Sequence, residues 1–264
     1  MPVVDVASDP RLALYRGVRD PELLRKHGVF IAEGRLVVRR LLEASAFRTR
    51  SVLVTPAARA ELSDLLDRLD ETRPVYEAAI DLFRELTGFN VHRGCLAIGE
   101  RPAPGAWRDV ARNARTLLVL EDVGNPDNIG GAFRAAAALG ADGVVLSPGC
   151  ADPLYRKSIR TSMAATLTLP FATADPWPDV LDDLRRDGIE IVALTPSGEE
   201  GLDDLRRASK IAVLAGHEER GLSEAALHHA DRRVRIPMAA GADSLNVVTA
   251  VAIALHHLSA MDDR

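Results

Sequence analysis

Three polar loops that contain glycine, each placed directly after a predicted strand, mark the second half of this chain of 264 residues. GNPDNIGG follows the run LLVLEDV, GHEERGLS follows IAVLA, and IPMAAGADSLN follows RRVR. Unbroken runs of Val, Leu and Ile are typical of parallel strands that are covered on both faces. Because the carboxyl ends of parallel strands lie along one edge of a sheet, we expect the three loops to form one composite site.

The second half of the chain alternates between predicted strands and predicted helices. We expect strands at Thr116–Val123, Gly143–Ser147, Ile189–Leu194, Lys210–Ala215 and Arg232–Pro237. We expect helices at Ile129–Leu139, Pro153–Leu167, Trp177–Asp187, Ser223–Ala230 and Leu245–Met261. This alternation predicts a doubly wound α/β domain with a parallel sheet, in which ligands bind at the carboxyl ends of the strands.

The first hundred residues predict a smaller α/β domain. Helical spacing in PELLRKHG precedes a mixed run, VFIAEGRLVVRRLLEA, and SVLVT and GCLAIGE have the character of buried strands. The segment Glu100–Asp109 interrupts the periodicity with prolines and a glycine. We therefore expect two domains, 1–105 and 106–264.

Composition excludes several classes of protein. No apolar stretch is long enough to span a membrane, and the two cysteines, Cys95 and Cys150, form no CxxC pair. We expect a cytoplasmic protein without a membrane segment and without a bound metal. GxGxxG and GxxxxGK[ST] are both absent, which argues against an unrelated enzyme with a standard NAD or ATP site.

Each loop also has a simpler structural interpretation. Asn128 and Arg134 in the first loop and its helix are explained by an N-cap region followed by an ordinary helical arginine. Glu218 in the second loop can point into a cleft or into solvent. In the third loop, Ser244 is a natural N-cap, whereas Asn246 has no equally obvious structural role.

Taken together, the loops resemble the three signature motifs of a known family. DNIGGAFR, GHEERGLS and IPMAAGADSLNVVTAVAIAL are similar, in order and spacing, to those of the SpoU (TrmH-type) RNA ribose 2′-O-methyltransferases of the SPOUT superfamily. The resemblance covers roughly Thr116 to Met261. A weaker resemblance over Pro21–Glu100 is to the L30e/L7Ae-like substrate-binding domain of ribosomal-RNA members. The chain departs from the family at His217, where Asn is more frequent, and at Ala164 or Ala165, where Gly is.

The resemblance implies a trefoil knot in the second domain, a homodimer, and S-adenosylmethionine as the cofactor, with no metal. It places the cofactor against a set of residues at the strand ends. These are Leu194, Thr195, Gly216, Ile236, Met238 and Leu245.

The resemblance also implies roles in catalysis. Arg134 is the residue that we expect to act on the ribose hydroxyl, with Asn128 orienting it or the ribose and Glu218 fixing the arginine or its loop. Ser244 and Asn246 would shape the part of the site that binds the methyl donor. Because a guanidinium keeps its proton under ordinary conditions, we expect Arg134 to stabilise developing negative charge and to hold the adjacent phosphate. Action of Arg134 as the general base stays open for a site that strongly favours its neutral form.

The substrate implied is RNA, most consistently 23S ribosomal RNA. The net charge is −5, but residues 1–50 carry ten Lys and Arg against six Asp and Glu, so we expect the first domain to supply much of the attraction for RNA. The basic residues expected there are Arg11, Arg16, Arg19, Arg25, Arg35, Arg39 and Arg40. Arg35 and Arg39, with Arg160 and Ser162 of the second domain, are the expected RNA contacts.

Three other functions stay open. The substrate can be the ribose of a transfer RNA, the methyl group can go to a base instead of a ribose, or the chain can be a non-catalytic RNA-binding protein of the same fold. Donor binding and the chemistry of the product distinguish these alternatives.

Overall fold

The computed structural model describes residues 8–17, 19–43, 45–87, 94–103, 105–239, 241 and 243–262. It divides into two compact units. Unit 1 comprises Met1–Ala103 and Leu154–Thr168, and unit 2 comprises Pro104–Pro153 and Leu169–Arg264. None of the helices in the described ranges is long and apolar enough to cross a membrane.

Unit 1 is built on a sheet in the order β1-β4-β2-β3. β4 (Cys95–Glu100) runs antiparallel to both β1 (Val29–Glu33) and β2 (Thr49–Val54), and β3 (Val75–Glu77) runs parallel to β2. The helices of this part of the chain are η1 (Pro10–Tyr15), α1 (Asp20–His27), α2 (Arg35–Glu43), α3 (Pro56–Glu61), α4 (Ser63–Leu66) and α5 (Ile80–Thr87).

Local sequence explains where these elements begin and end. Gly28 stops α1 with a φ of 62°, a left-handed conformation that glycine adopts without strain. Thr55 begins α3 because its hydroxyl accepts a hydrogen bond from the Ala58 amide at 3.3 Å. Side chains from η1, α1, α5 and the sheet, Phe83 and Leu23 among them, form one buried core. The alternation expected for the first hundred residues is confirmed.

The segment Leu154–Thr168 belongs to unit 1, which the sequence did not indicate. Its helix α8 (Arg156–Thr161) packs against β1, and the Arg156 guanidinium donates to the Asp20 carboxylate at 2.6 Å. The single helix expected over Pro153–Leu167 is wrong. Met163 and Ala164 have φ values of 52° and 68°, so the helix ends before them and a short 3₁₀ turn, η2 (Ala165–Leu167), follows. Ala164 thus occupies a conformation that favours glycine.

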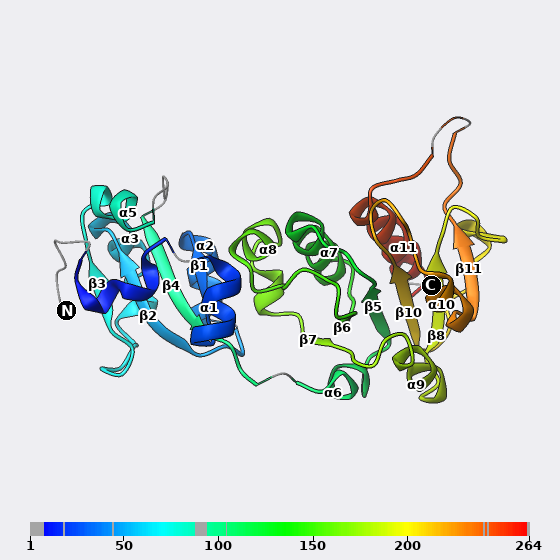
Figure 1. Ribbon diagram of the computed structural model, residues 1–264, viewed down its shortest axis with the longest axis horizontal. Helices are drawn as coiled ribbons and strands as arrows, with labels where there is room; N and C mark the ends of the chain where they lie inside the picture. Colours follow the sequence, from blue (N-terminus) through cyan, green and yellow to red (C-terminus); the bar gives the residue numbers. More distant parts are fainter. Residues whose placement is uncertain are drawn as a thin grey trace. The chain divides into compact units, whose positions relative to one another are not determined.

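Unit 2 is built on a parallel sheet in the order β7-β6-β5-β10-β8-β11-β9 (Figure 1). The strands are β5 (Thr116–Leu120), β6 (Gly143–Leu146), β7 (Phe171–Thr173), β8 (Glu190–Leu194), β9 (Glu200–Gly201), β10 (Ile211–Ala215) and β11 (Arg232–Arg235). The predicted parallel α/β sheet is confirmed, with β7 and β9 as short strands that the sequence did not indicate.

Helices cover both faces of this sheet. α6 (Trp107–Ala111), α9 (Val180–Arg186) and α10 (Glu224–His229) supply side chains to one buried core. α7 (Pro126–Ala138) and α11 (Val247–Asp262) pack against each other, and η3 (Leu202–Asp204) precedes β10. A Cβ on Gly131 would lie 2.8 Å from the Val248 side chain, so glycine permits the close contact of α7 with α11.

The strand order brings the site loops together. β10 lies between β5 and β8, so the chain returns to the middle of the sheet after it has formed the outer strands. The loops that leave the carboxyl ends of β5 and β10 are therefore neighbours. Doubly wound sheets bind ligands at such a reversal of strand order.

Candidate functional site

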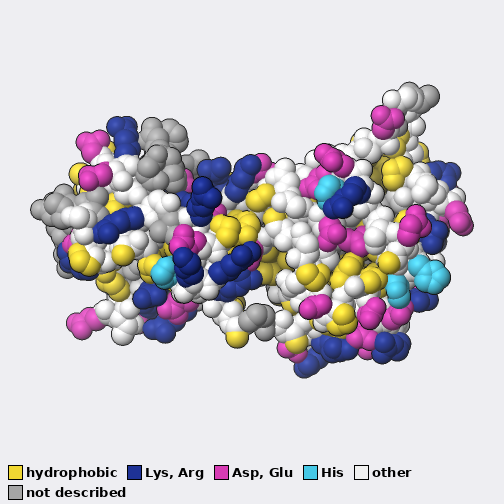
Figure 2. All heavy atoms as spheres, viewed as in Figure 1, with side chains coloured by type: hydrophobic (Ala, Val, Ile, Leu, Met, Phe, Trp, Pro, Cys, Tyr) yellow, Lys and Arg dark blue, Asp and Glu magenta, His cyan; other side chains and the backbone are white. Residues whose placement is uncertain are grey.

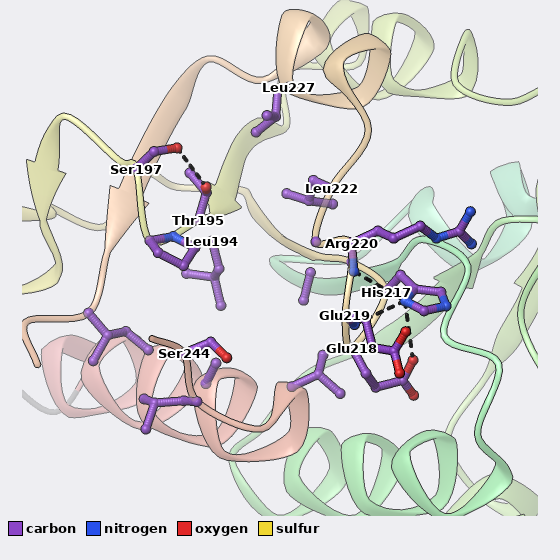
Figure 3. Close-up of a pocket in the computed structure, with 18 of the residues that line it drawn as sticks. Leu194, Thr195, Ser197, His217, Glu218, Glu219, Arg220, Leu222, Leu227 and Ser244 are labelled. Atoms are coloured by element: carbon purple, nitrogen blue, oxygen red, sulfur yellow. Dashed lines mark hydrogen bonds and ion pairs between the residues drawn. The ribbon is translucent and has the colours of Figure 1, made fainter. Parts of the chain in front are cut away.

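A pocket of about 490 Å³ opens at the carboxyl ends of β8 and β10 (Figure 3). Its walls come from the segment after β8, from the loop 216–223 after β10, and from residues between Ile236 and Val247, Met238 and Ser244 among them, that precede or begin α11. All six residues that the resemblance assigned to the cofactor line it. They are Leu194, Thr195, Gly216, Ile236, Met238 and Leu245.

The pocket is lined by apolar side chains and by polar or charged side chains in similar measure. Leu222 and Leu227 face Leu194 across the cavity, and the Thr195 and Ser197 hydroxyls form a 3.0 Å hydrogen bond at the end of β8 (Figure 3). Its volume lies within the usual range of about 300–1,000 Å³ for sites of small organic ligands and cofactors.

The loop 216–223 is a tight turn that its own sequence specifies. The amides of His217 and Gly221 donate to each other's carbonyl oxygens at 3.1 and 2.9 Å. A Cβ on Gly216 would lie 2.5 Å from the Gly221 carbonyl oxygen, which excludes any larger residue without movement of the backbone. The His217 Nδ1 atom accepts hydrogen bonds from the Glu219 and Arg220 amides at 3.0 and 3.4 Å. Histidine can therefore fill this position because Nδ1, like an amide oxygen, is an acceptor.

A chain of hydrogen bonds joins the three loops beside the pocket. Asn128 Nδ2 donates to Glu218 Oε1 at 2.7 Å, and Asn246 Nδ2 donates to Asn128 Oδ1 at 3.2 Å. Each side chain comes from a different loop, so the expected meeting of the three loops is confirmed. Asn128 uses both ends of its amide, which fixes its orientation.

Helix capping explains why Asn128 and Asn246 are placed in this way. Asn125 is the N-cap of α7, since its side-chain oxygen accepts from the Asp127 amide at 2.9 Å, and Asn128 is then free to reach the neighbouring loop. At α11 the side-chain oxygen of Asn246 accepts from the Val248 amide at 2.9 Å. The capping role that we considered for Ser244 thus belongs to Asn246, and Ser244 lines the pocket instead.

Arg134 is an exposed residue of α7 and does not line the pocket. Within the described part of the chain, its guanidinium has no hydrogen bond or ion pair. The partner expected for it, Glu218, is bonded to Asn128. The structure therefore brings Asn128, Glu218 and Asn246 together and leaves Arg134 at the surface, with no bonded partner among the residues that the structure describes.

Glu121, at the end of β5, is a site residue that the sequence analysis missed. It is only 3% exposed, and its carboxylate accepts from Trp177 Nε1 at 2.8 Å and from the Ser223 amide and hydroxyl at 2.8 and 2.7 Å. Ser223 is the last residue of the loop 216–223. A charged residue that directly follows a run of buried apolar residues was the available signal.

The residues expected to bind RNA are less free than their sequence suggested. Arg35 pairs with Glu61, and Arg39 pairs with Glu43 at 3.0 Å and with Asp64 at 2.9 Å. The Arg39 guanidinium lowers the pKa of the Asp64 carboxyl through their hydrogen bond. Figure 2 shows basic and acidic side chains interspersed on the visible face of unit 1.

The two residues proposed from α8 and the turn after it differ from each other. Arg160 is exposed. Ser162 is 1% exposed, and its hydroxyl donates to the Ile159 carbonyl oxygen at 2.9 Å. Ser162 is therefore wrong as a direct RNA contact, because its hydroxyl is buried and already bonded within unit 1.

Comparison with known proteins identifies clear relatives. The model of the SpoU rRNA Methylase family matches residues 115–256. An uncharacterised tRNA/rRNA methyltransferase of Mycobacterium tuberculosis is 42% identical over 257 residues, which cover 94% of this chain and 88% of that protein. The 23S rRNA (guanosine(2553)-2′-O)-methyltransferase RlmP of Bacillus subtilis is 24% identical and covers 98% of this chain and 99% of its own length.

A solved structure agrees with these matches. The SpoU methyltransferase AviRb from Streptomyces viridochromogenes, crystallised in complex with the cofactor AdoMet, superposes with a TM-score of 0.81. It is 26% identical, and the superposition covers 97% of this chain and 98% of that one.

Proposed function

The chain belongs to the SpoU rRNA methylase family and is an RNA methyltransferase, and from this premise we propose that it methylates the ribose 2′-hydroxyl of a nucleotide in 23S ribosomal RNA. The observation that carries the proposal is the hydrogen-bonded chain of Glu218, Asn128 and Asn246 beside a pocket with apolar and polar walls at the strand ends.

The pocket fits S-adenosylmethionine as the donor. Its apolar walls suit an adenine ring, while hydroxyls and backbone groups at the ends of β8 and β10 suit a ribose and an amino-acid moiety. The relative AviRb was crystallised in complex with AdoMet. When bound, this cofactor supplies an electrophilic methyl group.

Among the described residues there is no cluster of side chains able to hold a metal ion, and we assign none of these residues to one.

The chain's own residues position the attacking hydroxyl. A ribose hydroxyl is a weak nucleophile, so the site must orient it and stabilise the negative charge that develops on its oxygen. The side-chain amide of Asn128 is bonded to Glu218 through its nitrogen and to Asn246 through its oxygen, so its orientation in the site is fixed. Arg134 contributes a positive charge, which suits the oxyanion and the neighbouring phosphate.

Ribosomal RNA is the substrate that the relatives favour. RlmP aligns with both units of this chain and, by its name, acts on a 23S rRNA ribose. Transfer RNA is the alternative, since the mycobacterial relative is named for either RNA. A non-catalytic RNA-binding role fits poorly because the pocket and the polar chain beside it are both intact.

The family resemblance supports two further features of this enzyme. We propose that the segment 236–247 and α11 complete a trefoil knot around the cofactor pocket. We also propose that the enzyme is a homodimer that uses α11, whose sequence from Val247 to Met261 contains no charged residue and whose Ile253 is 37% exposed.

Transfer of labelled methyl from S-adenosylmethionine to RNA that lacks the modification tests the proposal. Label in large ribosomal RNA, at a site that resists alkaline cleavage, is the expected result, because a 2′-O-methyl group removes the nucleophile for that cleavage. Label in transfer RNA would correct the substrate. Absence of label, together with absence of donor binding by calorimetry, would contradict the proposal.

A further inference from the structure

Glu121 is a buried carboxylate at the centre of unit 2. It follows β5, its side chain is almost fully enclosed, and its amide donates to the Ala215 carbonyl oxygen at 2.9 Å, at the end of β10. A buried carboxylate is costly unless it is well bonded, so its retention at this point calls for a specific function.

Two of the three hydrogen bonds to this carboxylate come from one residue. Oε2 accepts from the Ser223 amide and Oε1 from the Ser223 hydroxyl, while Trp177 Nε1 shares Oε1. The Ser223 hydroxyl in turn accepts from the Ala226 amide at 3.1 Å and so caps α10. Ser223 is therefore held on both sides, and with it the end of the loop 216–223.

The same loop is held at a second point by Asn128, which binds Glu218. Between these two anchors lie Glu219, Arg220, Gly221 and Leu222, all of which line the pocket. Glu121 itself does not line the pocket, so it acts through the loop and not by contact with a ligand.

We propose that Glu121 is a positioning residue for the methyl donor, and that its bonds to Ser223 hold the loop 216–223 in the conformation that binds S-adenosylmethionine. This inference rests on the proposed function. Its specific content is that the contact with Ser223, and not the contact with Trp177, supports donor binding.

The test is Glu121→Gln, which keeps the shape of the side chain but replaces one acceptor oxygen by an NH₂ group. That group faces donors, so at least one bond to Ser223 or Trp177 is lost. We expect the Kd for S-adenosylmethionine, measured by calorimetry on the full chain, to rise about tenfold, as is typical for loss of a hydrogen bond to a charged group. At saturating donor, kcat should fall by a smaller factor than the Kd rises, because Glu121 acts through the loop and does not itself line the pocket.

Two matched variants separate positioning from a general loss of stability. Ser223→Ala removes the hydroxyl bond to Glu121, and Trp177→Phe removes the indole bond but leaves both Ser223 bonds in place. We expect Ser223→Ala to weaken donor binding as Glu121→Gln does. Trp177→Phe should lower the melting temperature of the donor-free protein and leave the Kd within about twofold of wild type.

Failure of this inference can be told apart from failure of the proposed function. Donor binding by Glu121→Gln equal to wild type would overturn the inference and leave the proposed function intact, as would an equal loss of affinity in Trp177→Phe. A wild-type chain that binds no S-adenosylmethionine would contradict the proposed function itself, and the inference with it.

Discussion

The two units of the molecule use their polar residues in different ways. In unit 2, Asn128, Glu218 and Asn246 come from three separate loops and bond to one another at the ends of the strands. In unit 1, Arg35 and Arg39 bond to carboxylates of the same surface. The polar groups of unit 2 build a site, whereas those arginines of unit 1 neutralise local charge.

The difference shows that two kinds of polar residue in a sequence predict function with unequal reliability. A polar residue at the end of a parallel strand is carried to the binding edge by the topology of the sheet. A surface arginine has no such constraint, and its availability to RNA depends on which carboxylates the fold places beside it. Positive charge in the sequence of unit 1 is therefore a weaker guide to RNA contacts than the loops of unit 2 are to the candidate site.

The largest effect is expected from removal of the exposed Arg134 guanidinium in unit 2. Arg134→Ala should lower kcat by roughly a hundredfold or more, since loss of one preorganised charge-stabilising group costs about 3–4 kcal/mol in the transition state. Arg112→Ala is the control, at an exposed arginine that pairs with Asp109, and it should leave kcat unchanged. Turnover of Arg134→Ala close to wild type would remove Arg134 from the reaction.

Asn128→Asp tests the bonded chain of unit 2. The new carboxylate would lose the donor to Glu218 and face its negative charge, at a cost of about 1.5–3 kcal/mol, so kcat/KM should fall by tenfold or more. Asn125→Asp makes the same change three positions earlier, where Asp is an equally good N-cap, and should keep activity. Equal activity of the two variants would show that the contact between Asn128 and Glu218 has no catalytic role.

Gly216→Ala tests the turn that forms one wall of the pocket. The added Cβ meets the Gly221 carbonyl oxygen, and relief of the overlap costs about 1–3 kcal/mol, so donor affinity should fall roughly tenfold. Gly124→Ala is the matched control, because the nearest atom to its Cβ is 3.9 Å away. Calorimetry with S-adenosylmethionine compares them, and unchanged affinity in Gly216→Ala would mean that the turn moves without consequence for the donor.

Arginines of unit 1 should show much smaller effects. Arg39→Ala should lower RNA affinity only about twofold and leave the salt dependence of binding unchanged, because Arg39 is bonded to two carboxylates. Arg160→Ala removes an exposed arginine and should flatten the plot of log K against log salt by about 0.7–0.9. An equal change of slope in both variants would show that the ion pairs of Arg39 open when RNA binds.

The smallest effect concerns one thiol in each unit. Burial raises the pKa of the Cys95 thiol to about 12 and that of the Cys150 thiol to about 11. Their protonated forms therefore stabilise the folded state fully below the ordinary thiol pKa of about 8.5, and this contribution is lost as pH rises towards 11 and 12. Alkylation at pH 8, followed by mass spectrometry along a urea series, should label each cysteine only as its own unit unfolds. Reaction in the native protein at the rate of a free thiol would contradict this.

Much of the fold could be predicted from local patterns, because the runs of Val, Leu and Ile and the helical spacing are properties of neighbouring residues. β7 was missed because three residues give too little pattern. The helix predicted over Pro153–Leu167 failed because Met163 and Ala164 adopt left-handed conformations that only the tertiary packing of unit 1 imposes.

The candidate site also has a part that could be predicted from the sequence and a part that could not. The polar loops followed from their position at strand ends and the pocket residues from the family resemblance, whereas three features depend on residues far apart in sequence. These are the bonds of Glu121 to Ser223, the ion pair of Arg39 with Asp64, and the burial of Ser162. No local pattern specifies such contacts, because the fold decides which distant segments meet.

Methylation of a ribose by the site of unit 2 can be followed by nucleoside mass spectrometry of ribosomal RNA that has been incubated with S-adenosylmethionine and either the wild-type chain or Arg134→Ala. We expect a single 2′-O-methylated nucleoside with the wild type and almost none with Arg134→Ala. A base-methylated nucleoside, or equal product from both proteins, would contradict this expectation.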